Sequence, residues 1–190
     1  MTVHDPVAAL RAATGAHHEL LDTGLPLAQL DAGLSAYVAH LQMLAAWLRP
    51  MQSWLARYSD GPQQPGLLPP ADRLALIDAD LREAGVAPIL DTDNAAWPVH
   101  ASAAYRWGVA YVVEGSQLGG AVLYKRLAER LAPHPLAYLK PGIEGPGPRW
   151  RLVMAALREH LQSDADIRDA CAGARAAFER ILALGQPAEM

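Results

Sequence analysis

The sequence lacks most features of a secreted, membrane-spanning or nucleic-acid-binding protein. Cys171 is the only cysteine among 190 residues, so an internal disulfide is impossible. No apolar run reaches the roughly 18 residues of a membrane-spanning helix, and MTVHDPVAAL has neither the basic nor the apolar region of a signal peptide. The net charge is −4 and the basic residues are scattered, which argues against nucleic acid. We therefore expect a cytoplasmic protein that binds neither nucleic acid nor membrane.

Strand patterns are missing as well. Almost every segment has apolar residues at spacings of three and four, and none shows the alternation of a β-strand. Hydrophobic residues make up 52% of the chain, which suits a packed core. The sequence therefore predicts an all-α fold, a helical bundle of about six to eight helices, in a single domain over residues 1–190.

Turn and capping residues divide this pattern into helices. Asp5 followed by Pro6 is a good helix start, and Gly85 is a good stop. Pro50 lies inside the second predicted helix and should kink or split it. We expect helices over about 6–22, 35–58, 71–84, 99–131, 149–162 and 164–184.

One long predicted helix carries an unusual density of glycine. The stretch EGSQLGGAVLYKRL contains Gly115, Gly119 and Gly120. Glycine costs about 1 kcal/mol in a helix interior, or about 3 kcal/mol for the three. Gly115 and Gly119 share a helix face, so they form a strip of bare backbone. Such a strip serves either close helix packing or a flat ligand pressed against the backbone; spacing alone leaves both open and slightly favours packing.

The first predicted helix contains two adjacent histidines. His17 and His18 point about 100° apart on a helix, and spacing alone does not choose between them. Both would be ordinary helix residues in the simplest interpretation. Asp22 lies four residues after His18, so its carboxylate could accept a hydrogen bond from one ring nitrogen of His18. Such a partner fixes the tautomer of a metal-binding histidine.

Most metal sites are excluded by spacing. The segment HELLD has an aspartate where a zinc-protease helix needs its second histidine. No glutamate has a histidine three positions later, as a ferritin-like di-iron site requires. Cysteine and histidine are not clustered as in a structural zinc site. What remains is a single histidine as the only protein ligand, an arrangement that suits heme iron.

Taken in order, LRAAT-x-x-x-H with an acid four residues later and EGSQLGG-x-V-L about 100 residues further on resemble the heme oxygenase family. The likeness covers most of the chain and is closest to bacterial members, including those that accompany bacteriophytochromes. It implies a heme-oxygenase-like fold and cleavage of heme, which is both cofactor and substrate, to biliverdin, carbon monoxide and ferrous iron. The reaction would use O2 and electrons from an external donor: a ferredoxin, a flavodoxin-type reductase, or ascorbate in vitro. A bacteriophytochrome is a candidate recipient of the biliverdin.

The resemblance also implies roles for the two segments. His18 takes the place of the proximal histidine, the axial ligand of the heme iron, and Asp22 that of its acidic partner. Gly115, Gly119 and Gly120 take the place of the distal glycines, which cover the oxygen side of the heme. We therefore expect heme to lie between the first helix and the glycine-bearing helix.

Further site residues follow from the same resemblance. Ser116 stands where animal members have an aspartate that organises a water network, which leaves the proton route open. Arg11, Lys125 and Arg151 match positions that contact the heme propionates. Tyr111 lies one turn before the glycines and either touches heme or belongs to the core.

Three rival interpretations remain at this point. A heme-binding protein could store or sense heme without degrading it. The fold could serve without heme, as in helical relatives that act on thiamine breakdown products or carry a di-iron centre. A purely structural protein would use the glycines for packing. Cys171 is expected to fill a packing position, and Glu114 to cap or pair locally.

Overall fold

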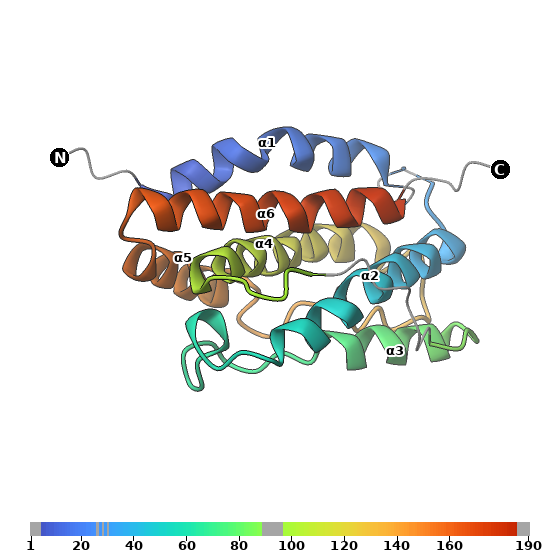
Figure 1. Ribbon diagram of the computed structural model, residues 1–190. Coiled ribbons are helices and arrows are strands. Elements are labelled where there is room, and N and C mark those ends of the chain that lie inside the picture. The colour runs from blue at the N-terminus through green and yellow to red at the C-terminus, as the bar shows by residue number, and fades with distance from the viewer. Residues whose placement is uncertain (1–4, 26, 28, 30, 89–96, 186–190) are drawn as a thin grey trace.

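The computed structural model describes residues 5–25, 27, 29, 31–88 and 97–185, and over these it contains six α-helices and no strand (Figure 1). The helical fold predicted from the spacing is therefore confirmed. The elements are α1 (Pro6–Gly24), α2 (Leu34–Leu55), the 3-10 turn η2 (Gly61–Gln63), α3 (Arg73–Glu83), α4 (Ala103–Leu127), α5 (Gly147–His160) and α6 (Asp164–Gly185).

The helix ends follow local chemistry. α1 begins at the predicted place, where the Asp5 carboxylate accepts a hydrogen bond from the Val7 amide at 3.2 Å. α4 begins four residues later than predicted, because the Ser102 hydroxyl caps it by accepting from the Tyr105 amide at 3.0 Å. α3 ends just before Gly85, whose φ of +74° suits glycine.

Pro50 was expected to kink or split the second helix, and the split does not occur. α2 runs as one element from Leu34 to Leu55 with Pro50 inside it. Trp47, Met51 and Trp54 are buried along the same helix. Burial of these large side chains outweighs the hydrogen bond that a proline removes.

The tightest contact of the bundle joins α4 to α6. A Cβ atom at Gly108 would lie 1.8 Å from the carbonyl oxygen of Ala170, and one at Gly173 would lie 2.0 Å from the carbonyl oxygen of Tyr105. The two backbones therefore approach more closely than any side chain would allow. α1, α4 and α6 run in the same direction across Figure 1, and α6 packs against both of the others. This close crossing sets where the rest of α4 lies relative to α1.

None of the helices that the structure describes is both long enough and apolar enough to cross a lipid bilayer.

Candidate functional site

A cavity of about 640 Å³ opens between α1, the second half of α4 and α6. This volume falls within the roughly 300–1,000 Å³ that is usual for small-molecule sites. The wall is mostly apolar, with a few polar groups. It is lined by His18, Leu21, Asp22, Leu25, Leu27, Trp47, Tyr111, Val112, Gly115, Ser116, Leu118, Gly119, Val122, Leu123, Arg126, Trp150, Phe178 and Ile181.

His18 stands on the α1 wall of this cavity with one ring nitrogen engaged. Its Nδ1 lies 2.9 Å from Oδ2 of Asp22, one turn later on the same helix. With the proton on Nδ1, His18 donates to the carboxylate and its Nε2 is left as an acceptor. Its side chain is 64% exposed. This imidazole is therefore oriented and held in the tautomer that a metal ligand needs.

The neighbouring His17 is placed differently. It is not among the residues that line the cavity. Its Nε2 lies 3.8 Å from a carboxylate oxygen of Glu179 on α6, and its side chain is 23% exposed. Of the two adjacent histidines, which spacing could not separate, His18 lines the cavity and His17 does not.

Of the three glycines predicted to form the strip on α4, Gly115 and Gly119 line the cavity and Gly120 does not. A Cβ at Gly119 would meet nothing within 4 Å, although the residue lines the cavity. A Cβ at Gly115 would lie 3.5 Å from the Trp150 ring, and one at Gly120 would lie 3.6 Å from Leu139. These are ordinary contact distances. Helix packing therefore does not require glycine at these three positions.

Two aromatic residues of the cavity lining pack against each other. The Tyr111 and Trp150 rings have centroids 5.5 Å apart, inclined at 42°. Burial raises the pKa of Tyr111, although the positive charge of Arg11 and a hydrogen bond with Thr14 oppose that rise. Tyr111 is thus a neutral phenol in the cavity wall. Trp150 was not predicted, because it follows a proline- and glycine-rich connection that offers no spacing relation to the other segments.

Ser116 also lines the cavity, and its hydroxyl is engaged within α4. It donates to the carbonyl oxygen of Val113 at 2.7 Å and accepts from Nε2 of Gln117 at 3.3 Å. The hydroxyl is therefore held by the helix itself and by the side chain next to it.

The three basic residues expected near the propionates lie outside the lining. Arg11, Lys125 and Arg151 are exposed, and none of them lines the cavity. Arg126 does line it, and its guanidinium donates to the carbonyl oxygen of Leu27. Sequence reasoning passed over Arg126 because the resemblance pointed to its neighbour.

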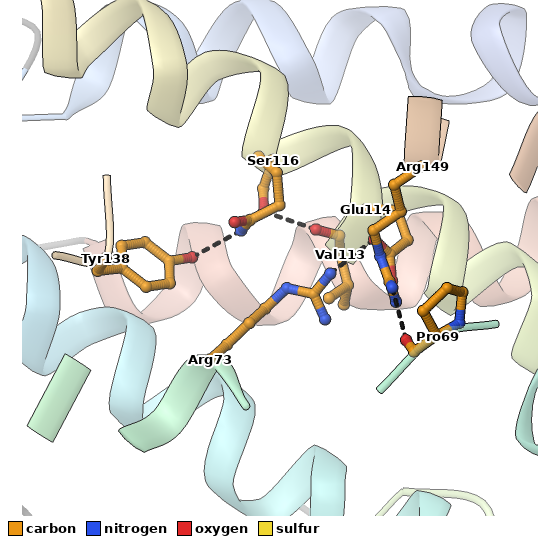
Figure 2. A network of polar contacts seen from close by, with 8 residues as sticks. Pro69, Arg73, Val113, Glu114, Ser116, Tyr138 and Arg149 are labelled. Atoms are coloured by element: carbon orange, nitrogen blue, oxygen red, sulfur yellow. Dashed lines mark hydrogen bonds and ion pairs between the residues drawn. The ribbon is translucent and has the colours of Figure 1, made fainter. Parts of the chain in front are cut away.

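Glu114, directly before the first glycine of the strip, is buried among charged groups from distant segments (Figure 2). Arg149 binds its carboxylate with two nitrogens, at 2.7 and 2.9 Å, and Arg73 binds it at 2.6 Å. The expectation of local pairing was wrong, because both partners lie on other helices. Burial alone would raise the pKa of Glu114, but the hydrogen bonds and positive charges of Arg149 and Arg73 together lower it. The cluster ties α3 and α5 to the centre of α4.

The donors at the cavity suit heme and do not suit a metal ion held by the protein alone. Within the described ranges, no group of three histidine, cysteine, aspartate or glutamate residues is placed to hold a metal ion. His18 offers a single imidazole beside a mostly apolar cavity. Heme brings its own equatorial nitrogens and needs only such an axial ligand.

Comparison with known proteins agrees with this geometry. The sequence pattern of the family described as Heme oxygenase matches residues 5–186. A protein named Heme oxygenase from Xanthomonas campestris pv. campestris (strain 8004) is 38% identical over 153 residues, which cover 78% of this chain and 87% of that protein. A crystal structure of a NO- and CO-bound heme oxygenase from Neisseria meningitidis superposes with a TM-score of 0.73 at 21% identity, over 98% of this chain and 96% of that one. The last comparison concerns the fold alone.

Proposed function

This chain belongs to the heme oxygenase family and is an enzyme of that kind, and on that premise we propose that it binds and opens heme in the cavity between α1 and α4. The products would be biliverdin, carbon monoxide and ferrous iron. The observation that carries the proposal is the pair of facing walls: the imidazole of His18 on one side and the bare backbone at Gly119 on the other.

On the α1 side, His18 would be the axial ligand through Nε2. The Asp22 carboxylate accepts from Nδ1 at 2.9 Å, so it keeps the ring in one tautomer and makes it a better donor. Both side chains are about two-thirds exposed, and a planar ligand laid over them would remove them from water. Heme bound there would supply the iron that activates O2, and its own ring would be the substrate.

On the α4 side, the residues would orient the bound heme and O2 and exclude competing reactions. Gly115 and Gly119 line the cavity without side chains, so a flat ligand and a small molecule above it would fit against the backbone, and Gly120 follows directly, where α4 meets Leu139. Ser116 is the hydroxyl nearest to this surface along α4, and we assign it to the proton route. Its hydrogen bond to the Val113 carbonyl keeps its oxygen in place.

At the edge of the cavity, basic and aromatic residues would set the in-plane orientation of the ring. Tyr111 lines the cavity within reach of the charge of Arg11, and Arg151 follows the lining residue Trp150 on α5. Arg126 and Lys125 lie near the end of α4. We propose that these basic residues bind the two heme propionates. Which of the basic residues the propionates contact would set the rotation of the ring and therefore decide which ring position is opened.

The physiological setting is also part of the proposal. We expect the protein to work in the cytoplasm, with electrons from a ferredoxin or a flavodoxin-type reductase and with ascorbate as a substitute in vitro. A bacteriophytochrome would be the receiver of the biliverdin. Neither nucleic acid nor membrane is expected as a partner.

The first prediction tests whether His18 binds the heme iron. Purified protein should bind heme about one to one with a histidine-ligated absorption spectrum, and His18→Ala should lose that signature. His17→Ala is the matched control, because His17 lies one residue away but outside the cavity lining. Ascorbate under air should then produce the biliverdin band only in proteins that keep the ligand. Loss of ligation in His17→Ala with retention in His18→Ala would overturn the assignment, and heme binding without biliverdin would point to storage or sensing instead.

A further inference from the structure

A row of polar contacts leads from the cavity wall at Ser116 to Gln117 and Tyr138, neither of which lines the cavity. Nε2 of Gln117 lies 3.3 Å from the Ser116 hydroxyl and donates to the Tyr138 hydroxyl at 3.0 Å (Figure 2). Tyr138 lies in the connection between α4 and α5. A cavity-lining hydroxyl is thus joined, through one amide, to a residue 22 positions later in the chain.

Tyr138 is itself fixed by a buried carboxylate. Its amide donates to Oδ2 of Asp80 at 2.9 Å, and the Ala137 amide donates to Oδ1 at 2.9 Å. Asp80 is completely buried and also accepts from the Tyr37 hydroxyl at 2.6 Å. Three donors on one buried carboxylate make a rigid anchor, because any movement would leave a charge without partners. The connection therefore presents Tyr138 at a defined place.

The same segment supports the weak part of α4. Leu139 lies beside Gly120, where a Cβ atom would approach Cδ2 at 3.6 Å. Tyr138 and Leu139 therefore contact α4 along the stretch that carries the glycines. A stretch with three glycines in six residues has lost intrinsic helix stability, so an outside support helps to keep its shape. The anchored segment behind α4 supplies that support.

Tyr138 remains neutral in this position. Burial raises its pKa, although the hydrogen bond from Gln117 and the positive charge of Arg73 oppose that rise. The negative charge of Glu114 acts in the same direction as burial. A neutral phenol that accepts from a fixed amide serves as an anchor for hydrogen bonds and not as a source of protons at neutral pH.

We propose that Tyr138 is a positioning residue for the oxygen side of the heme site. Its hydroxyl holds the Gln117 amide, and that amide holds the Ser116 hydroxyl at the cavity wall. This inference rests on the proposed function, because it assumes that the Ser116 wall is the side on which O2 is handled.

The test is Tyr138→Phe in the heme-loaded protein, read by the pH at which the ferric heme absorption spectrum changes from its neutral to its alkaline form. We expect the midpoint to shift by about 0.5 pH unit, because a Gln117 amide freed from Tyr138 no longer fixes the Ser116 hydroxyl at the cavity wall. Heme affinity should stay within about twofold, since Tyr138 does not line the cavity. Gln117→Met breaks the same link from the α4 side and should shift the midpoint alike if Tyr138→Phe folds poorly. The matched control is Tyr58→Phe, which removes hydrogen bonds to Val99 and from Ala101 outside the cavity lining.

The mechanism of the shift is tested by a double-mutant cycle. If Tyr138 acts through Ser116, then Ser116→Ala combined with Tyr138→Phe should shift the midpoint no more than Ser116→Ala alone. Additive shifts, or a Tyr138→Phe midpoint equal to that of Tyr58→Phe, would overturn the inference. Failure of the proposed function has a different signature, because it would appear as unchanged heme ligation in His18→Ala whatever Tyr138 does.

Discussion

The two halves of α4 use glycine for opposite reasons. Near its start, a side chain at Gly108 would lie 1.8 Å from the Ala170 carbonyl oxygen, so the absence of a side chain lets α6 come close. Three turns later, a side chain at Gly119 would meet nothing within 4 Å. One glycine is required by the protein's own packing, and the other keeps a space clear.

This contrast separates stability from function along a single helix. The α4–α6 contact holds the bundle together, whereas the glycine strip weakens α4 and gains nothing in packing. Residues around the strip compensate: Glu114 ties it to α3 and α5, and Leu139 backs Gly120. Here a helix segment of weak helical propensity is held by contacts from other segments. This pattern is expected where a ligand supplies the contacts that the missing side chains would have made.

The largest effect is expected for Gly108→Ala. The added methyl group would overlap main-chain atoms of α6, which cannot rotate away as a side chain does, so the two helices must separate. We expect the free energy of unfolding to fall by about 4 kcal/mol or more, or the protein not to fold. Urea denaturation followed by circular dichroism of the heme-free protein measures it. A loss below about 1 kcal/mol would mean that the two backbones are not in close contact.

A smaller loss of stability is expected for Glu114→Gln, which removes the negative charge between the two halves of α4. The variant leaves Arg73 and Arg149 facing a neutral amide, and we expect a loss of about 3 kcal/mol in the free energy of unfolding. Because the pKa of Glu114 is lowered in the folded protein, its contribution is fully present above the unfolded value of about 4.3. It is lost as pH falls through the lowered folded value.

The difference in stability between wild type and Glu114→Gln should therefore be constant near neutral pH and shrink only under acid conditions. Denaturation measured over a series of pH values tests this. Asp78→Asn is the control for removing a carboxylate from an ion pair elsewhere, because Asp78 accepts from Arg49 at 2.8 Å and neither residue contacts Glu114 or lines the cavity. A difference that grows toward acid pH would contradict the assigned charge of Glu114.

The smallest effect on stability is expected for Gly119→Leu. The new side chain has open space, so the free energy of unfolding should change by no more than about 1 kcal/mol. Heme affinity should nevertheless fall more than about tenfold, because the side chain fills the space meant for the ring or for O2. Heme titration and circular dichroism measure the two quantities. Gly119→Ala is the control: it should stabilise the heme-free protein by up to about 1 kcal/mol, and undiminished turnover in Gly119→Leu would return the strip to a structural role.

Local features of this protein were predictable from sequence because they depend on residues a few positions apart. The Asp5 cap, the helical periodicity and the four-residue spacing of His18 and Asp22 all express the pitch of a helix. The failures concern partners that are distant in the chain. Pro50 stays inside a continuous helix because of what α2 buries, and Glu114 pairs across 41 and 35 residues instead of locally.

The sequence by itself determined that the chain is helical, where its first helix begins, and that two segments about 100 residues apart carry the family's pattern. Only the tertiary structure decided which histidine lines the cavity, which glycines pack and which leave space, and which distant groups, such as Trp150, Arg126 and Tyr138, stand beside them. The physical reason is the distance along the chain over which each interaction acts. Hydrogen bonds and side-chain spacing within a helix depend on residues a few positions apart, whereas the contact between two helices depends on how the whole chain buries its apolar surface.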